Sequence, residues 1–157
     1  MYKKLLTLCL LHTDTHILLG RKKRGVGVGK WNGFGGKVEQ GEKIEDAGRR
    51  EVLEEAGIHL PDIEKTGIIH FEFEGSPEIW EVHIFRAKEF LGDPTESEEM
   101  EPKWFAIDEI PFEYMWQDDK FWVPLFLKGV KFKGKFSFDS ENRLVSGGVE
   151  EVIELED

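Results

Sequence analysis

The sequence predicts an α/β fold in which a mixed β-sheet is sandwiched between α-helices. Three observations predict it: short apolar runs typical of strands, a stretch of clear helical periodicity between them, and a second apolar helix later in the chain. Strands that precede and follow a helix, with another helix afterwards, favour a sheet covered on both sides. The 157 residues fit one domain, which we expect to span residues 1–157.

The first two strands are predicted from the apolar runs Leu5–Leu11 and Ile17–Leu19. Residues 13–15, Thr-Asp-Thr, separate the runs and indicate a tight turn. Because both runs are continuously apolar, we expect the strands to be buried on both faces. The glycine-dense residues 25–36 that follow are too irregular for a helix or a repeat. We expect them to form loop and short strand next to a ligand.

The first helix is predicted over Ile44–Ala56, where apolar residues recur at helical spacing and Gly57 provides a C-terminal stop. A second, buried helix is predicted over Phe121–Lys128. It contains Pro124, which a start at Phe121 would place in the first turn, where proline is tolerated.

The later strands are short apolar or alternating segments. They are Ile68–Phe73, Ile79–Phe85, Trp104–Ile107, an alternation of Phe and Lys from Lys131 to Phe138, and one late strand within residues 142–157. The first two flank Gly75-Ser76-Pro77, so we expect them to pair as a hairpin.

Composition excludes several classes of protein. The chain has 32 acidic and 21 basic residues and a net charge of −11, which argues against binding a nucleic acid polymer or an anionic membrane. Its one cysteine, Cys9, rules out an internal disulfide. The N-terminus lacks the layout of a signal peptide, and no apolar stretch is long enough to cross a membrane. We expect a monomeric cytoplasmic protein.

Three glutamates on the first predicted helix are candidate catalytic groups. Glu51, Glu54 and Glu55 stand at i, i+3 and i+4, so they share one helix face with Cβ atoms about 5–6 Å apart. Like charges at this spacing repel one another, and a hard divalent cation such as Mg²⁺ relieves the repulsion. The three residues alone also fit a solvated acidic face.

The surrounding motif favours the metal. Residues 36–58, GKVEQGEKIEDAGRREVLEEAGI, match every position of the Nudix box G-x5-E-x7-R-E-U-x-E-E-x-G-U, where U is aliphatic. The matching residues are Gly36, Glu42, Arg50, Glu51, Val52, Glu54, Glu55, Gly57 and Ile58. A chance match in such a chain has a probability on the order of one in ten million. The sequence therefore resembles the Nudix hydrolases, which implies the Nudix fold and an enzyme acting on phosphoanhydride bonds.

The resemblance implies a role for each polar position of the box. The implied Mg²⁺ ligands, with Mn²⁺ as a substitute metal, are the carbonyl of Gly36 and the carboxylates of Glu51, Glu54 and Glu55. Arg50 would orient a catalytic carboxylate, Glu42 would brace the loop, and Glu55 would also activate water. This is chemically reasonable, because hydrolysis of a phosphoanhydride needs neutralised negative charge and an activated water.

Segments outside the box resemble the eukaryotic MutT-homolog branch of the family, which destroys oxidised purine nucleoside triphosphates. They are LLGRKKRG (18–25), WNGFGGKV (31–38), FEF (71–73), ESEEM (96–100) and MWQDD (115–119), and the resemblance extends over roughly residues 5–138. It implies that Asn32, Asp118 and Asp119 read the base. It also implies pocket walls at Phe71, Trp116 and Trp122, pocket edges at Thr7 and Lys22, and an additional metal ligand at Glu99.

Each of these pocket residues also has a simpler explanation. Asparagine among glycines is typical of a turn, adjacent aspartates often cap a helix, and large tryptophans fill cores. The basic run Arg21–Arg24 fits the steering of a triphosphate and equally a solvated turn. The five histidines show no metal-ligand spacing, so we assign them no site. Only joint occurrence with the box favours the functional interpretation.

Three residues depart from the pattern of the branch. Val26 stands where phenylalanine is typical, Trp80 where methionine is typical, and Gln117 where proline is typical. We expect Trp80 to narrow the mouth of the base pocket and Val26 to open space opposite it. Because the box is intact, the departures concern base preference and not hydrolysis.

The expected function is Mg²⁺-dependent cleavage of oxidised purine (deoxy)nucleoside triphosphates, such as 8-oxo-dGTP and 2-hydroxy-dATP, to the monophosphate and pyrophosphate. One alternative is a Nudix hydrolase of another substrate, such as a dinucleoside polyphosphate. Another is a nucleotide sensor without turnover. The intact glutamates argue against a sensor, and Asn32 with Asp118 argues against a substrate that lacks a purine.

Overall fold

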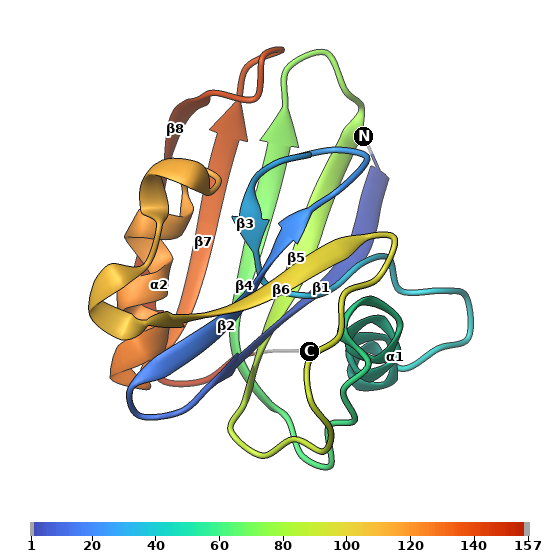
Figure 1. The fold of residues 1–157 in the computed structure, drawn as a ribbon. Coiled ribbons are helices and arrows are strands. Elements are labelled where there is room, and N and C mark those ends of the chain that lie inside the picture. Colours follow the sequence, from blue (N-terminus) through green and yellow to red (C-terminus); the bar gives the residue numbers. More distant parts are fainter. Residues whose placement is uncertain (1, 156–157) are drawn as a thin grey trace.

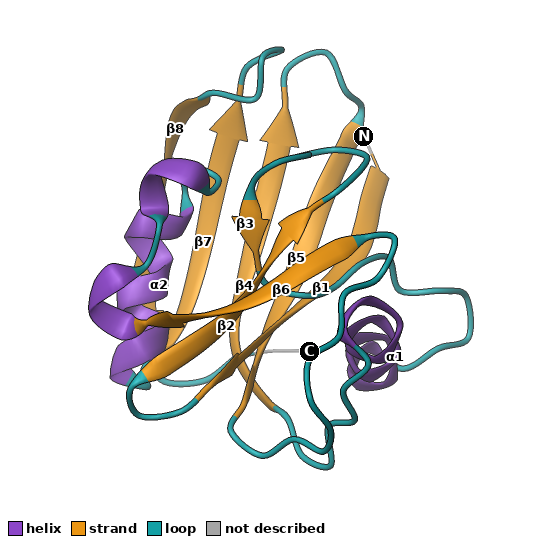
Figure 2. Cartoon of the chain, in the orientation of Figure 1, coloured by secondary structure: helices purple, strands orange, loops and turns teal. Residues whose placement is uncertain are grey.

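The computed structural model describes residues 2–155 and contains one eight-stranded sheet flanked by two α-helices (Figures 1 and 2). The strands are β1 (Tyr2–His12), β2 (His16–Lys22), β3 (Trp31–Asn32), β4 (Glu64–Phe73), β5 (Glu78–Ala87), β6 (Met100–Ala106), β7 (Lys131–Phe138) and β8 (Leu144–Val152). The helices are α1 (Ile44–Ala56) and α2 (Asp119–Lys128). No helix within residues 2–155 is long and apolar enough to span a bilayer.

The sheet is mixed, as predicted. Its order is β3-β2-β1-β5-β4-β7-β8, and β6 pairs with β2. The pairs β1–β5 and β4–β7 are parallel, and the remaining pairs are antiparallel. Figure 1 shows β2 and β6 running obliquely across the longer strands, so the sheet curls and leaves a hollow between its two halves.

The two helices pack against opposite faces of the sheet. Successive residues of a strand point to opposite faces, so β1 contributes to two cores. Cys9 packs in one core with Val52 of α1, whereas Leu10 packs in the other with Trp122 and Phe126 of α2. This confirms the predicted sandwich and the predicted burial of the first strands on both faces.

Helix α1 has the predicted boundaries. Gly57 ends it with φ of 71°, a left-handed conformation that favours glycine, and its N–H donates to the carbonyl of Leu53 at 3.0 Å. The predicted start of the second helix is wrong. Helix α2 begins at Asp119, because Asp119 N–H already donates to Trp116 O at 3.1 Å. Pro124 therefore lies in the second turn and not the first.

The predicted hairpin, the Phe–Lys strand and the late strand are confirmed as β4–β5, β7 and β8. The prediction of a strand at Trp104–Ile107 is wrong in its bounds. Strand β6 starts at Met100 and pairs with β2 along its whole length, from Met100 opposite Lys22 to Ala106 opposite His16. Pairing with a distant strand extends β6 over a sequence that contains Pro102, and Ile107 begins a short 3₁₀ turn.

Candidate active site

A cavity of about 350 Å³ opens between β1, β3, β4, β5 and the start of α2. It brings together all ten residues that the sequence analysis assigned to substrate binding. They are Thr7, Lys22, Val26, Asn32, Phe71, Trp80, Trp116, Asp118, Asp119 and Trp122. Gly36 and Glu55 of the Nudix box line the same cavity. Thr7 and Asp118, which are 111 positions apart in the chain, thus line the same cavity.

Glu55 is the carboxylate of α1 that reaches the cavity. Its side chain is buried, and its Oε1 accepts a hydrogen bond from the Gly35 N–H at 2.9 Å. Burial raises the pKa of Glu55 to about 8, and the charge of Glu51 adds to the rise, while the Gly35 hydrogen bond opposes it. Burial also raises the pKa of Glu51. Burial therefore disfavours the negative charge of both groups, and a divalent cation would stabilise it.

Arg50 organises the other acidic groups of the box. Its Nε donates to Glu42 Oε2 at 2.8 Å, its Nη1 to Glu51 Oε1 at 2.8 Å, and its Nη2 to the carbonyl of Lys37 at 3.1 Å. Glu54 lies farther out, 3.4 Å from Nη1 and 57% exposed. Arg50 therefore ties the loop before α1 to the helix and holds Glu51 in position.

The predicted metal ligands do not all converge. Within residues 2–155, no three His, Cys, Asp or Glu side chains are arranged to hold a metal ion. Glu51 is engaged by Arg50, and Glu99 is engaged by Arg24 through a salt bridge. The Gly36 carbonyl accepts the Thr7 N–H at 2.9 Å. The donor set is nonetheless entirely oxygen, which hard cations prefer.

Gly35 and Gly36 let the loop before α1 approach β1 and the carboxylate of Glu51 closely. A Cβ at Gly35 would lie 1.8 Å from the carbonyl oxygen of Thr7, which is backbone of β1. A Cβ at Gly36 would lie 2.6–2.8 Å from the carboxyl atoms of Glu51, the flexible end of a side chain. The two positions therefore respond differently to a methyl group.

We expect Gly36→Ala to lower kcat/KM about tenfold, because the added methyl group displaces the carboxylate of Glu51. The melting temperature should change little, because this side chain can move away without strain. Gly35→Ala should destabilise the protein by about 1–3 kcal/mol, because backbone of β1 cannot yield as easily. Activity assays and thermal unfolding of both variants measure the difference. If Gly36→Ala kept full activity, the position of Glu51 would not matter for turnover.

The cavity also holds two adjacent buried carboxylates, Asp118 and Asp119. Asp118 Oδ2 accepts a hydrogen bond from Trp122 Nε1–H at 2.8 Å, whereas Asp119 Oδ2 is buried and has no hydrogen-bond partner among the described residues. Burial raises the pKa of both groups, and the charge of Asp118 raises the pKa of Asp119 further. Asp119 is therefore the more readily protonated of the two and is aimed into the cavity.

Asn32 is fixed by its neighbour. Its Oδ1 accepts the Gly33 N–H at 2.9 Å, which turns the amide nitrogen toward other partners.

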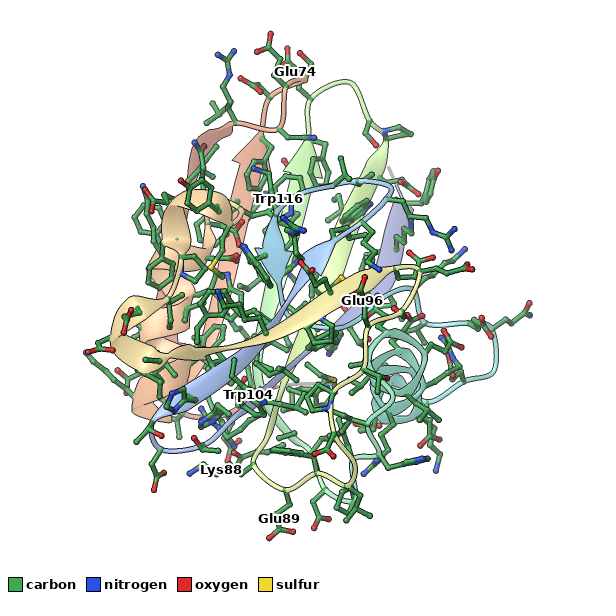
Figure 3. All side chains as sticks on the ribbon, viewed as in Figure 1. Glu74, Lys88, Glu89, Glu96, Trp104 and Trp116 are labelled. Atoms are coloured by element: carbon green, nitrogen blue, oxygen red, sulfur yellow. The ribbon has the colours of Figure 1, made fainter. Side chains whose placement is uncertain are left out.

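Trp116, labelled in Figure 3, packs on the glycine loop, where a Cβ at Gly27 would come within 2.9 Å of its Nε1. The Phe73 ring lies 4.8 Å from Trp80, and Lys4 Nζ lies 5.0 Å from the same indole. Aromatic faces therefore enclose the cavity.

Several lining residues were missed by the sequence analysis. They include Lys4, Phe73, Met100 and Phe138. Phe73 could have been found, because the strand alternation places it on the same face as Phe71. Met100 ends the segment ESEEM (96–100) of the resemblance, from which only Glu99 was assigned a role. Gln117, which departs from the branch, does not line the cavity; its Oε1 accepts the Leu144 N–H at 2.7 Å.

Comparison with known proteins agrees with the fold. Residues 3–126 match the NUDIX domain, and the chain belongs to the Nudix family. Members of this family generally use divalent metal cations.

Similar proteins are found among both curated sequences and solved structures. The chain is 52% identical to the oxidized purine nucleoside triphosphate hydrolase of Mus musculus, over 95% of this chain and 96% of the relative. It is 53% identical to the protein of the same description from Danio rerio, over 97% of each chain. A crystal structure of a MutT protein from Bacillus halodurans superposes with a TM-score of 0.82 at 30% identity, over 94% of this chain and 97% of that chain.

Proposed function

We propose that the protein hydrolyses oxidised purine nucleoside triphosphates, such as 8-oxo-dGTP and 2-hydroxy-dATP, to the monophosphate and pyrophosphate, and acts as one domain over residues 1–157. The observation that carries this proposal is one cavity that joins a buried Asp118–Asp119 pair to Glu55 of the Nudix box. The names of the mouse and zebrafish relatives support the substrate class. Cleansing of the nucleotide pool follows from that activity.

We propose Mg²⁺ as the metal, with Mn²⁺ as a substitute. Gly36, Glu51, Glu54, Glu55 and Glu99 would hold it, because they supply only oxygen and because desolvation raises the pKa of Glu51 and of Glu55. When bound, the metal neutralises phosphate charge and lowers the pKa of water. Glu99 and Glu51 would have to exchange Arg24 and Arg50 for the cation.

The chain's own groups supply the remaining chemistry. Glu55 lines the cavity, and its ionised carboxylate can take a proton from the attacking water. Lys22 lines the same cavity and can pair with phosphate oxygens. In this proposal Glu55 and Lys22 act on the triphosphate, and the aromatic walls of the same cavity bind the base.

The base is read by donors and acceptors in an apolar enclosure. A protonated Asp119 donates a hydrogen bond, whereas an ionised Asp118 only accepts. The indole of Trp122 stabilises the charge on Asp118 through its hydrogen bond. Trp116 and Phe71 offer faces on which a purine can stack.

The proposal is tested by kcat/KM across a panel of normal and oxidised purine triphosphates, with a dinucleoside polyphosphate included. We expect oxidised purines to exceed their normal counterparts by at least about tenfold, which corresponds to 1.4 kcal/mol. A preference for the dinucleoside polyphosphate would favour another Nudix substrate. Nucleotide binding without turnover in the presence of metal would favour a sensor.

Trp80 and Val26 are expected to set base preference. Both line the cavity, and Val26 is 56% exposed at its mouth. The double change Trp80→Met with Val26→Phe should alter the ratio of kcat/KM for 8-oxo-dGTP and 2-hydroxy-dATP by roughly threefold or more, because methionine adapts to a ligand and an indole is rigid. Val145→Phe is the control, since residue 145 is exposed and lies outside the cavity. Unaltered ratios in the double variant would mean that neither side chain contacts the base.

A further inference from the structure

A second cavity, of about 430 Å³, lies where the β1–β2 turn, the end of β5 and the end of α2 meet. It shares no lining residue with the first cavity. Figure 3 labels Lys88 of the second cavity and Trp116 of the first toward opposite ends of the molecule. Nothing in the proposed reaction uses this cavity.

The guanidinium of Arg86 forms part of its wall and is buried, with only 8% of the residue exposed. Its Nη1 donates to His12 Nε2 at 2.5 Å, and its Nη2 donates to the carbonyl of Phe126. The guanidinium carbon also lies 4.2 Å from the centre of the Phe126 ring. All three partners are uncharged acceptors when His12 is neutral, so they hold the arginine without balancing its charge.

His12 is held neutral by its contacts. Its Nδ1–H donates to the carbonyl of Thr13 at 2.9 Å, which leaves Nε2 to accept from Arg86. Burial lowers the pKa of His12, and the charges of Arg86 and Lys88 add to that, against Thr13 and Asp14, which raise it. The imidazole therefore orients Arg86 and contributes no charge.

Neutralisation of Arg86 by acidic side chains is weak. Glu64 Oε1 lies 3.7 Å from Arg86 Nε, and the Glu64 side chain is 67% exposed. Asp14 also lines the cavity but is exposed. Lys88 and Lys128 line it as well, so three permanent cations face two exposed carboxylates. The chain as a whole has a net charge of −11, whereas the wall of this cavity carries more positive than negative side chains around a buried guanidinium.

We propose that this second cavity is a binding site for a small anion of the phosphate class. Arg86 has one N–H on each of Nη1 and Nη2 beyond those that donate to His12 and Phe126, and two lysines at the rim add charge without fixed geometry. The volume exceeds the needs of one phosphate group, and Ile107 and Leu127 supply apolar surface for the rest of an organic phosphate. Because Arg86, Lys88 and Lys128 outnumber the two carboxylates of the wall, we expect binding without a divalent metal.

The test is an amide chemical-shift titration of the full chain without divalent metal, using inorganic phosphate, pyrophosphate and a nucleoside monophosphate in separate arms. We expect saturable shifts at the amides of Thr13, Lys88 and Gly129, which border the cavity. The arm with the tightest binding distinguishes a free phosphate or pyrophosphate from a phosphate ester. Because turnover is not measured, the outcome is independent of the proposed function.

The matched variants are two double changes that each remove two exposed positive charges. Lys88→Gln with Lys128→Gln should weaken binding roughly tenfold. Lys103→Gln with Lys135→Gln lies outside the cavity and should leave binding nearly unchanged. Arg86→Met should abolish the shifts; because Arg86 also caps α2 and this variant could fail to fold, the lysine pair provides the decisive comparison.

Three results would overturn the proposal. One is the absence of saturable shifts at these amides up to about 10 mM of every anion. Another is equal weakening in the two double variants, which would indicate a general charge effect. The third is shifts confined to Gly35 and Gly36, which would place the anion in the first cavity.

Discussion

Glu55→Gln should reduce kcat for the best triphosphate about 100-fold or more, while nucleotide binding persists through the base pocket. The amide keeps the shape of the side chain but can neither take a proton nor balance a cation. Glu45→Gln, on the same helix and outside the cavity, is the matched control and should retain activity. A loss smaller than about tenfold, or 1.4 kcal/mol, would show that Glu55 is not the central catalytic carboxylate.

The same substitution should make the metal-free protein more stable at higher pH. The pKa of Glu55 is raised from 4.5 to about 8 in the folded state, so the native state binds the proton more tightly than the unfolded state. The contribution of Glu55 to the stability of the wild-type protein therefore falls as the pH rises from about 4.5 to 8. Glutamine does not titrate, so the variant shows no such fall. Denaturant unfolding of both proteins at about pH 5 and about pH 8 measures the difference in their free energies of unfolding. A variant that is less stable than wild type at pH 8 would contradict the burial of an unbalanced carboxylate.

Asp118→Asn should penalise 8-oxo-dGTP and 2-hydroxy-dATP unequally. The two bases present different donors and acceptors, and exchange of a proton between Asp118 and Asp119 would let the pair match either pattern. An asparagine fixes one pattern, so one substrate leaves a buried polar group unsatisfied, at a cost of about 1–3 kcal/mol. We expect kcat/KM to fall roughly 5- to 150-fold more for that substrate than for the other.

Asp119→Asn is the matched variant and should reverse the order of the two penalties. The pKa of both aspartates is raised by burial, and the charge of Asp118 raises that of Asp119, so each substitution removes a different partner of the exchange. Steady-state kinetics on both substrates measures the ratios. Equal losses for both substrates, or no loss, would reject proton exchange and leave the metal chemistry intact.

Local patterns determined the elements and the box. Both boundaries of helix α1 were predicted correctly. The apolar spacing and the C-terminal glycine that define them are local features of the sequence. The alternation of Phe and Lys predicted β7 for the same reason. The box could be found because its residues have a fixed spacing along the chain. The resemblance then implied eight substrate-binding residues, its departures added Val26 and Trp80, and all ten line the cavity.

The tertiary structure decided what depends on distant pairing and on burial. Strand β6 extends to Met100 because β2 supplies its hydrogen bonds, which no local pattern records. The raised pKa of Glu55, the orphaned oxygen of Asp119 and the buried guanidinium of Arg86 follow from desolvation by strands and helices far apart in the chain. Residue types and spacing are properties of the sequence, whereas dielectric environment and charge balance exist only once the chain has folded.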